Sequence, residues 1–427
     1  MRLSIVGAGS TYTPELIDGV IRRREHLPIT SIVLYDIDLN RLKVIGDFAR
    51  RMIDASGGGI EIHQTNSQDE AVQDARFVVS QFRIGNQAAR HRDELIGRKF
   101  NLVGQETVGV GGFAKGIRTI PVAIALADSI LKYSPNATLL NFTNPAGMIT
   151  EALLRERPAL QTIGLCNVPW NVKTEIANTL SVPFQELELD YVGLNHLSWV
   201  RGLKVAGQDL SREAILGFQG LVGKQNPDDE EPYWSQESIS QLGAIPNYYL
   251  LYYYETQKWL RFQRNAPTRA SVVMEIEKSL LLRYQDKELT NKPEELMKRG
   301  GAYYSDSAAQ LMTDIATDSG AIHIVNTRNM GAVPGMDVQQ VMEMPCMVNS
   351  TGAHPIPVQA MRPDIEALVK TVKDFELLTI EAAVEGDETA AIRALVTNPL
   401  GPDLSQAKEV WQTIKEEHRG LLGKLDD

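Results

Sequence analysis

The chain has 427 residues, 43% of them hydrophobic and 23% charged, so it can bury a large core and divide into about two or three domains. The formal net charge of −11 argues against nucleic acid or an anionic membrane as the main partner, because both reward clustered Lys and Arg. Cys166 and Cys346 are too few for a disulfide framework and suit a reducing compartment. The start of the chain runs directly into a strand pattern without a long apolar segment, so we expect a cytoplasmic protein.

Short apolar runs alternate with amphipathic stretches through the first 165 residues. This alternation predicts a Rossmann-type, doubly wound parallel sheet with helices on both faces. Thr13 and Pro14 are placed as the N-cap and the first residue of the first helix, and 118–135 is apolar at helical spacing. The predicted strands lie at 3–9, 31–36, 75–82, 137–144 and 161–167.

After about residue 200 the pattern changes. The acidic stretch 225–232 is typical of a surface loop, and the remainder is mainly amphipathic and helical. We therefore predict an NAD-binding domain over 1–167 and a mixed, largely helical α/β domain over 168–427, with the site between them. The long apolar helices indicate a homodimer or homotetramer. The helical stretches are 242–264, 269–285, 305–319, 364–385 and 403–422.

The stretch "IVGAGST" follows a strand and precedes a helix, as a dinucleotide-binding turn does. Gly7 allows the tight turn, and Gly9 lets backbone N–H groups, with Ser10 and Thr11 beside them, approach a pyrophosphate. Tyr12 stands where the standard fingerprint has its third glycine. Asp36 ends the second strand, where a carboxylate can hold ribose hydroxyls and favours NAD over NADP. A purely structural turn is the alternative explanation of the glycines.

Three further groups of polar residues lie near predicted strand ends. Arg90 follows the third predicted strand and either grips a phosphate or faces solvent. Glu106 lies in the glycine-rich stretch 104–121, which is either a flexible loop or one that closes over a ligand. Asn144 precedes a proline at the end of a strand, where both a helix cap and a ligand contact are possible.

Cys166 in "GLCNVP" stands at the exit of a predicted strand, and His196 lies in a "GLNH" turn. A buried cysteine is often only a small hydrophobic residue. Thiolate and imidazole are nevertheless good ligands for a divalent transition metal, and two protein ligands would leave positions open for substrate oxygens. The stretch 248–254 contains five tyrosines, which either pack or supply a base beside a metal.

The motifs "IVGAGSTYTPEL", "GQET", "FTNPAGMITEA", "GLCNVP", "GLNHLSW" and "IPNYYLLYYY" occur in order over nearly the whole chain. Together they resemble the NAD-dependent glycoside hydrolases of family 4. Asn167 in "CNVP" is similar to members that act on 6-phospho-β-glucosides, whereas α-specific relatives tend to have Asp or His there. The resemblance therefore implies a phosphorylated disaccharide or β-glucoside as substrate, with NAD and Mn²⁺ or another divalent metal as cofactors.

The resemblance also implies a redox-assisted elimination. NAD⁺ takes a hydride from C3, a tyrosine removes the acidified C2 proton, the aglycone leaves C1, water adds, and NADH returns the hydride. Glucose 6-phosphate and an alcohol or sugar are the expected products. Family roles that carry over are metal binding by Cys166 and His196, and base catalysis by Tyr249, with Tyr248 as the alternative. Expected substrate contacts are Arg90, Glu106, Asn144, Asn167 and Arg269.

Two other classes of protein share the nucleotide motif. A lactate/malate-type 2-hydroxyacid dehydrogenase would have a similar two-part architecture, but the cysteine, histidine and tyrosine motifs have no role in its chemistry. A redox-sensing protein that holds NAD without catalysis would need none of those residues either. Titration of the metal against activity separates the three classes.

Overall fold

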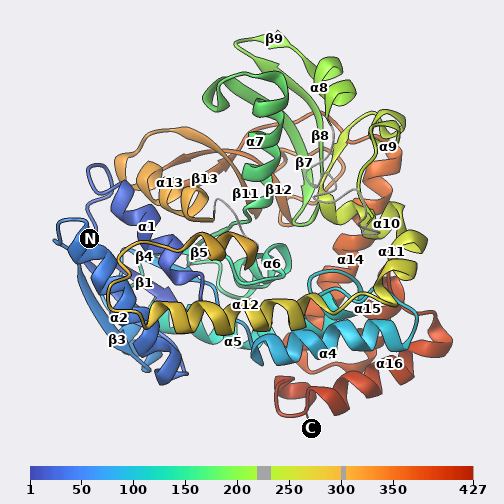
Figure 1. The fold of residues 1–427 in the computed structure, drawn as a ribbon. Coiled ribbons are helices and arrows are strands. Elements are labelled where there is room, and N and C mark those ends of the chain that lie inside the picture. The colour runs from blue at the N-terminus through green and yellow to red at the C-terminus, as the bar shows by residue number, and fades with distance from the viewer. Residues whose placement is uncertain (219–231, 300–303, 427) are drawn as a thin grey trace.

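The strands of the protein form one continuous sheet (Figure 1). The computed structural model describes residues 1–218, 232–299 and 304–426. Within these ranges the sheet has 13 strands in the order β10-β8-β7-β12-β11-β6-β5-β4-β1-β2-β3, with β13 beside β12 and β9 beside β8. The strands are β1 Arg2–Val6, β2 Ser31–Tyr35, β3 Glu61–Thr65, β4 Phe77–Ser80, β5 Thr138–Asn141, β6 Gln161–Gly164, β7 Leu187–Leu194, β8 Leu197–Val205, β9 Gln208–Asp209, β10 Ile245–Pro246, β11 Ala321–Arg328, β12 Val341–Asn349 and β13 Gly352–Pro355.

Strands β3, β2, β1, β4, β5 and β6 pair in parallel, in the order of a dinucleotide-binding fold. The predicted Rossmann-type sheet is therefore confirmed. Its inner strands are apolar and buried, whereas β3, with the sequence EIHQT, is a partly exposed edge strand that the apolar pattern did not reveal. The helices of this half are α1 Thr13–Arg22, α2 Leu39–Ala55, α3 Gln68–Val72, α4 Asn86–Lys99, α5 Gly109–Tyr133, α6 Ala146–Glu156 and α7 Val168–Leu180.

Two local predictions in this half are wrong. Tyr12, and not Thr13, is the N-cap of α1, and the Thr13 hydroxyl instead donates to the carbonyl of Ala8 over 2.9 Å. The predicted loop 104–121 is mostly helix, because α5 already begins at Gly109. A side chain at Gly111 would overlap the carbonyl oxygen of Gln105, so this glycine serves close packing of the helix rather than loop flexibility.

Helix α5 is, among the described residues, the one helix long and apolar enough to cross a membrane. Its 18-residue apolar window is 78% buried inside the protein. Packing against α4, α6 and α14 accounts for that burial, so the apolar character of α5 belongs to a core helix.

The second half extends the sheet with antiparallel strands, which the sequence analysis did not predict. β11 pairs with β6 and β12, and β7 joins β12 to β8. The predicted helix 242–264 is wrong as a single element, because β10 and a 3₁₀ turn interrupt it. The helices are α8 Ser211–Gly217, α9 Gln236–Leu242, α10 Leu251–Tyr254, α11 Thr256–Gln263, α12 Arg269–Tyr284, α13 Tyr304–Thr317, α14 Pro363–Glu385, α15 Glu388–Thr397 and α16 Leu404–Glu417, with 3₁₀ turns η1 Phe184–Glu186, η2 Tyr248–Leu250, η3 Glu294–Arg299 and η4 Gly423–Leu425.

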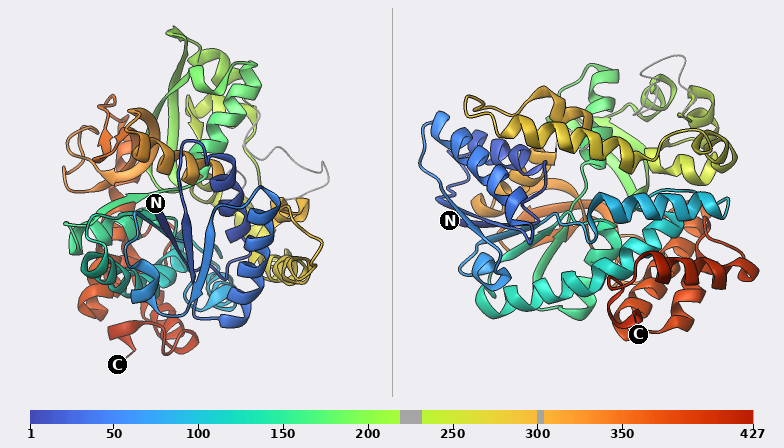
Figure 2. Two further views of the ribbon diagram at one scale, coloured as in Figure 1. Left: turned by 90° about the vertical axis from the view of Figure 1, so that its left-hand side faces the viewer. Right: turned by 60° about the horizontal axis from the view of Figure 1, so that its bottom comes forward.

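Helices from the C-terminal half pack on the helices of the N-terminal half. α13 packs on α1, α14 packs on α5 and α6, and α16 packs on α4. Figure 2 shows the red C-terminal helices against the cyan and teal helices of the first half. The predicted domain boundary at 167/168 falls between β6 and α7 and stays a prediction. Most of the predicted acidic loop, 225–231, lies outside the described residues.

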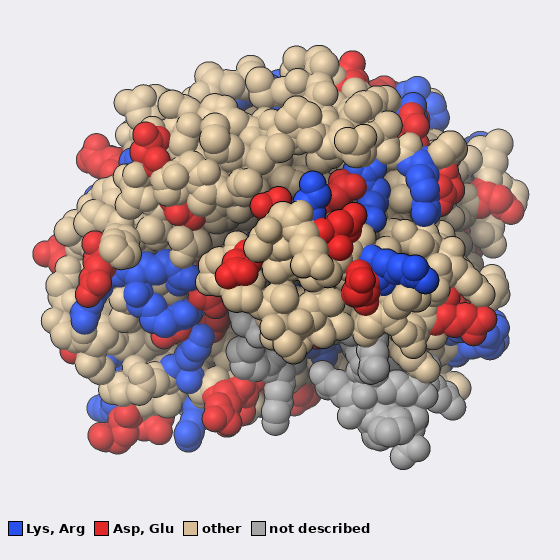
Figure 3. All heavy atoms as spheres, turned by 90° about the horizontal axis from the view of Figure 1, so that it is seen from above, with Lys and Arg blue, Asp and Glu red and all other residues tan. Residues whose placement is uncertain are grey.

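On the face seen in Figure 3, basic and acidic side chains are interspersed among larger neutral areas. Many charged side chains form ion pairs close to the protein surface, such as Arg22 with Asp306 and Lys43 with Asp47. Such pairs contribute little to stability because water screens them.

Candidate active site

A cavity of about 1140 Å³ extends along the carboxyl ends of β1, β4, β5 and β6. Open α/β sheets bind ligands at this edge. Most of the predicted site residues line the cavity, although Thr11 is fully buried outside the lining, where its carbonyl accepts a hydrogen bond from Tyr284. The lining includes Gly7, Gly9, Ser10, Asp36, Arg90, Glu106, Asn144, Cys166, Asn167, His196, Tyr248, Tyr249 and Arg269.

The glycine turn and Asp36 form one interlocked unit at one end of the cavity. Gly7 has φ +87°, and a Cβ there would lie 2.6 Å from the backbone of Phe82, so glycine is required. The Gly9 N–H donates to Asp36 Oδ2 over 2.7 Å, and a Cβ on Gly9 would meet the same carboxylate at 2.8 Å. The turn therefore keeps its backbone open toward the cavity and holds the acid beside it.

A charged group over this end combines Glu277 and Arg299 of the second half with Arg41 of α2 in the first half. Glu277 on α12 accepts hydrogen bonds from Arg41 over 3.1 Å and from Arg299 over 2.7 Å. The Arg299 guanidinium also lies 5.0 Å from the centre of the Tyr12 ring, which occupies the place of the third fingerprint glycine. Sequence reasoning missed this group, because an acid on an amphipathic helix carries no distinguishing pattern.

Cys166 and His196 meet at the other end of the cavity, with Cys166 Sγ 3.4 Å from His196 Nε2. The Thr107 hydroxyl donates to Gln105 Oε1, so its oxygen accepts from His196 Nδ1 over 3.0 Å. This relay fixes the tautomer, and the unprotonated Nε2 faces the thiol. Burial lowers the pKa of His196 to about 3 and raises the pKa of Cys166 to about 12.

The turn between β7 and β8 holds His196 in a left-handed conformation with φ +64°. Behind this turn the buried carboxylate of Glu343 accepts hydrogen bonds from Tyr191, over 2.6 Å, and from Asn195, over 3.1 Å. A further bond from Asn326, over 3.1 Å, ties Glu343 to β11. The hairpin tip is thus supported from beneath by a network that spans two neighbouring strands.

The donor set at this turn fits a divalent transition metal. A sulfur and an unprotonated imidazole nitrogen face each other across a space that opens into the cavity. No group of three or more His, Cys, Asp or Glu gathers around a common point in the described part of the chain, so Cys166 and His196 would be the main protein ligands. Open coordination positions would then remain for a bound substrate.

Tyr249 lies directly on this pair, because its ring stacks on the His196 ring with centroids 3.8 Å apart and planes 2° from parallel. Asn247 positions it by accepting a hydrogen bond from the Tyr249 N–H over 2.9 Å and donating to Ser198 on β8 over 3.1 Å. Tyr248 contacts Tyr249 edge to face at 5.9 Å. Burial raises the pKa of Tyr249, Cys166 and Glu106 raise it further, and Arg90 and Arg269 oppose this.

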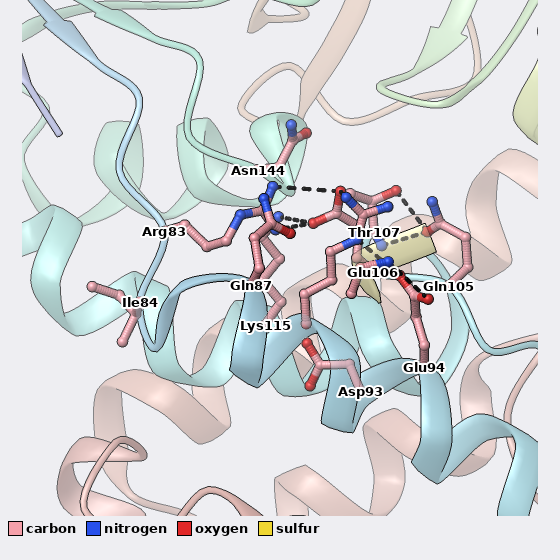
Figure 4. Close-up of polar contacts among 12 residues, drawn as sticks. Arg83, Ile84, Gln87, Asp93, Glu94, Gln105, Glu106, Thr107, Lys115 and Asn144 are labelled. Carbon is pink, nitrogen blue, oxygen red and sulfur yellow. Dashed lines mark hydrogen bonds and ion pairs between the residues drawn. The ribbon is translucent and has the colours of Figure 1, made fainter. Parts of the chain in front are cut away.

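Glu106 forms ion pairs with three cationic side chains on a second wall of the cavity (Figure 4). It pairs with Arg83, with Arg90 Nη1 at 3.2 Å and with Lys115 Nζ at 2.7 Å. These cations hold the pKa of Glu106 well below its usual range, although burial opposes them. Burial lowers the pKa of Lys115 to about 7, and Arg83 adds to the effect.

Arg83 and Lys115 were missed from the sequence, although each had a signal. Arg83 directly follows the predicted strand 75–82, at the edge where ligands bind, and Lys115 is a buried lysine among apolar residues in the first half of α5. One turn below Lys115 on α5, Arg118 forms a buried two-pronged ion pair with Asp93 on α4, at 2.9 and 2.5 Å. This pair fixes the alignment of the two helices that carry Arg90 and Lys115.

The remaining predicted contacts come from different elements. Asn144 follows β5, and its Oδ1 accepts from the N–H of Ala146 over 3.3 Å. Asn167 is the N-cap residue of α7, and Arg269 is the exposed first residue of α12. All three line the same cavity as Cys166 and Tyr249.

The cavity of this Rossmann-type fold thus joins a glycine-rich, dinucleotide-type turn to a thiol–imidazole pair and a stacked tyrosine. The profile of the family 4 glycosyl hydrolases matches residues 2–182, and that of their C-terminal domain matches 191–401. The chain belongs to glycosyl hydrolase family 4.

Relatives with assigned names agree with this family. The chain is 40% identical to a probable 6-phospho-beta-glucosidase of Bacillus subtilis, over 99% of this chain and 97% of the relative. It is 39% identical to the 6-phospho-beta-glucosidase BglT of Thermotoga maritima, over 98% of this chain and 99% of that one.

Solved structures place the fold in the same family. The 6-phospho-beta glucosidase of Thermotoga maritima, solved with manganese, NAD⁺ and glucose-6-phosphate, superposes with a TM-score of 0.90 at 37% identity, covering 98% of each chain. The lactate dehydrogenase of Cryptosporidium parvum, at 14% identity and a TM-score of 0.55 over 90% of this chain and 97% of that one, shares the fold alone.

Proposed function

We propose that this protein hydrolyses 6-phospho-β-glucosides by an NAD⁺- and Mn²⁺-dependent oxidation, elimination, addition and reduction, releasing glucose 6-phosphate and an alcohol or sugar. One observation carries the proposal. The Cys166–His196 pair, with its tautomer fixed by Thr107, lies under the ring of Tyr249 in the cavity that also contains the nucleotide turn. A 2-hydroxyacid dehydrogenase has no use for this arrangement, and the low identity to lactate dehydrogenase supports fold likeness only.

The residues present fit both cofactors. Gly7, Gly9 and Asp36 would hold the dinucleotide, and Cys166 and His196 would hold the metal. When bound, NAD⁺ supplies reversible hydride acceptance at C3 of the sugar, and the divalent metal supplies positive charge for oxygens at C2 and C3.

The role of Tyr249 in this reaction is removal of the proton at C2. Its ring is fixed by the stack on His196 and by Asn247, so the phenol has a defined position beside the sugar. Burial raises its pKa, which keeps the phenol protonated until positive charge lies nearby. Arg90 and Arg269 already lower the pKa of Tyr249, and a cation at the Cys166–His196 pair would lower it further.

The charged wall is suited to the 6-phosphate. Arg83, Arg90 and Lys115 face the carboxylates of Glu106 and Glu94, so positive charge is in excess on this wall of the cavity when Lys115 is protonated, below about pH 7. A phosphate can accept charge-assisted hydrogen bonds from such a group, each contributing roughly 1.5–3 kcal/mol. Asn144 and Asn167 are placed to hold sugar hydroxyls, and Asn167 supports the β-specific assignment.

A single experiment tests the function. The purified protein is assayed for p-nitrophenol release from p-nitrophenyl β-glucoside with and without the 6-phosphate, each with NAD⁺ and Mn²⁺ present or omitted. We expect turnover only for the phosphorylated substrate with both cofactors, without net accumulation of NADH. Stoichiometric NADH formation, or equal kcat/KM for the two substrates, would contradict the proposal.

The cellular setting and assembly belong to the same proposal: a cytoplasmic homodimer or homotetramer. Both cysteines are buried and free, as suits a reducing compartment. Ile322 and Met347 pair across β11 and β12 and are both exposed, 62% and 42%, which supports an apolar contact between copies. Sedimentation of the wild type and of Ile322→Glu tests the assembly, and a monomeric wild type would contradict it.

A further inference from the structure

The wall of the cavity that continues outward from Tyr249 is aromatic. Tyr249 and Tyr252 have ring centroids 5.9 Å apart, Tyr252 and Trp259 are 4.6 Å apart, and Trp259 and Phe262 are 5.3 Å apart. All four side chains line the cavity. This aromatic wall, defined as Tyr252, Trp259 and Phe262, thus leads away from the Cys166–His196 pair along α10 and α11.

The aromatic wall lies apart from the main hydrophobic core. Its backing is a separate small cluster that includes Val103, Val108 and Leu400. Gln263 anchors the end of α11 by accepting from the Gly104 N–H over 2.9 Å and donating to the Leu102 carbonyl over 2.7 Å. The rings therefore pack against this cluster on one side and line the cavity on the other.

The far end of the wall is also held in place. Arg98 on α4 donates to the carbonyls of Ala266, over 2.8 Å, and Pro267, over 3.2 Å, and all three residues line the cavity. Phe262 is half-buried, so part of its ring remains open. The wall is a fixed surface in which Tyr252 and Trp259 are buried and Phe262 is partly exposed.

The other sides of the cavity already have occupants under the proposed function, on which this inference rests. The glycine turn takes the dinucleotide, and the cations around Glu106 face the phosphate. A sugar between Cys166 and Tyr249 then leaves the side of the aromatic wall for the substituent on C1. We infer that Tyr252, Trp259 and Phe262 form the subsite for the leaving group, selecting aglycones with an apolar ring face.

The chemistry of the wall specifies that class of aglycone. Aromatic rings pack well against an aryl group or against the C–H face of a pyranose, whereas a methyl group offers little contact area. The subsite would thus favour aryl 6-phospho-β-glucosides and 6-phosphorylated β-linked disaccharides over small alkyl glucosides. Because glucose 6-phosphate has no aglycone, its binding would not depend on the wall.

The test compares phenyl and methyl 6-phospho-β-glucosides in the holoenzyme and in Phe262→Ala. We expect kcat/KM for the phenyl substrate to fall about three- to tenfold more than that for the methyl substrate, the range of one aromatic contact. The same relative loss is expected for 6-phospho-β-glucosyl-(1→4)-glucose if the wall also accepts a pyranose face. Inhibition by glucose 6-phosphate should stay unchanged.

Matched variants separate recognition from packing. Phe262→Tyr keeps the ring and should retain the phenyl preference, whereas Phe262→Leu keeps most of the packing and should lose it. Tyr254→Leu removes an exposed ring of α10 that faces Trp234 and lies outside the cavity lining, and should leave the preference intact.

Equal losses for the phenyl and methyl substrates in Phe262→Ala and Phe262→Leu would overturn the subsite and leave the wall as packing. A wild-type protein that turns over neither substrate with NAD⁺ and Mn²⁺ would instead refute the proposed function. The two failures are therefore distinguishable in one set of assays.

Discussion

Tyr249 and Tyr248 are neighbours in sequence, yet only Tyr249 stacks on His196. Replacing Tyr249 by Phe keeps the ring but removes the phenol, so NAD binding should persist. Exchange at C2 should fall by about two to four orders of magnitude, the usual reach of a general base. The measurement is deuterium at C2 of glucose 6-phosphate formed in heavy water, followed by NMR.

Tyr248→Phe is the matched control and should lose far less exchange. If the wild-type product carries no deuterium at C2, elimination is not the route, whatever either variant does. Ordinary two-carboxylate glycosidases do not break the C2–H bond, so the label also separates the two kinds of hydrolase.

The Cys166–His196 pair supports a prediction about metal removal. Cys166→Ser and His196→Ala should lower Mn²⁺ affinity and nearly abolish turnover, because each would remove one of the two proposed protein ligands. NAD binding should survive, since the glycine turn is at the other end of the cavity. Titration of Mn²⁺ by calorimetry measures the affinity, and full activity of either variant after chelation would rule out the metal site.

Lys115 makes stability depend on pH in an unusual direction. The pKa of Lys115 is about 7 in the folded protein and 10.5, the ordinary lysine value, in the unfolded chain. Between these pH values the unfolded chain therefore binds a proton that the folded chain does not. Stability conferred at this site therefore rises with pH across that window, and below pH 7 the buried charge costs its full amount. In Lys115→Met, denaturant midpoints should lack this rise, while Lys43→Met, on an exposed lysine, should retain it. Parallel wild-type and Lys115→Met profiles would contradict the assignment.

At the scale of elements, the sequence predicted the parallel half well and the antiparallel half poorly. Strands such as β1 and β5 are short apolar runs bounded by turn residues, which single out a buried parallel strand. β7 and β8 have mixed burial, and the pairing that joins β12 to β7 links strands distant in sequence, so the local pattern did not indicate these strands. The stretch 242–264 has helical spacing, but Pro246 and pairing with β8 break it.

The candidate site was predictable where a strand end carries an uncommon residue, as with Cys166 and Asn144. It was not predictable where tertiary packing supplies the partner. The tautomer relay through Thr107 joins residues 89 positions apart, and the grouping of Arg83 with Lys115 depends on how the β4–α4 loop lies against α5.

The geometry of the glycine turn depends on the absence of a Cβ at Gly9. In Gly9→Ala the new Cβ would meet the Asp36 carboxylate at 2.8 Å and disturb its bond to the turn. We expect NAD affinity to fall at least tenfold with little change in Mn²⁺ affinity, because only the turn is altered. Fluorescence titration of NADH measures this. Gly58→Ala, at a surface turn with nothing within 4 Å, is the control, and equal NADH affinities of Gly9→Ala and wild type would refute the role of the turn.

At the scale of the whole molecule, the sheet is continuous and helices of the second half pack on those of the first. We therefore predict that the two halves unfold together. β6 and β11 join the halves within one sheet, and α13 and α14 of the second half cover helices of the first. All five tryptophans lie after residue 167, so their fluorescence reports mainly on the second half, although Trp411 also packs edge to face on Phe113 of the first.

Leu3, fully buried in β1, provides the perturbation in the first half. Leu3→Ala should destabilise by about 2–5 kcal/mol through loss of core packing. If the chain is one cooperative unit, the urea midpoint seen by tryptophan fluorescence should fall by the same amount as that seen by far-UV circular dichroism, since no intermediate keeps the second half folded. An unchanged tryptophan transition beside a shifted dichroism transition would show instead that 1–167 and 168–427 unfold as independent domains.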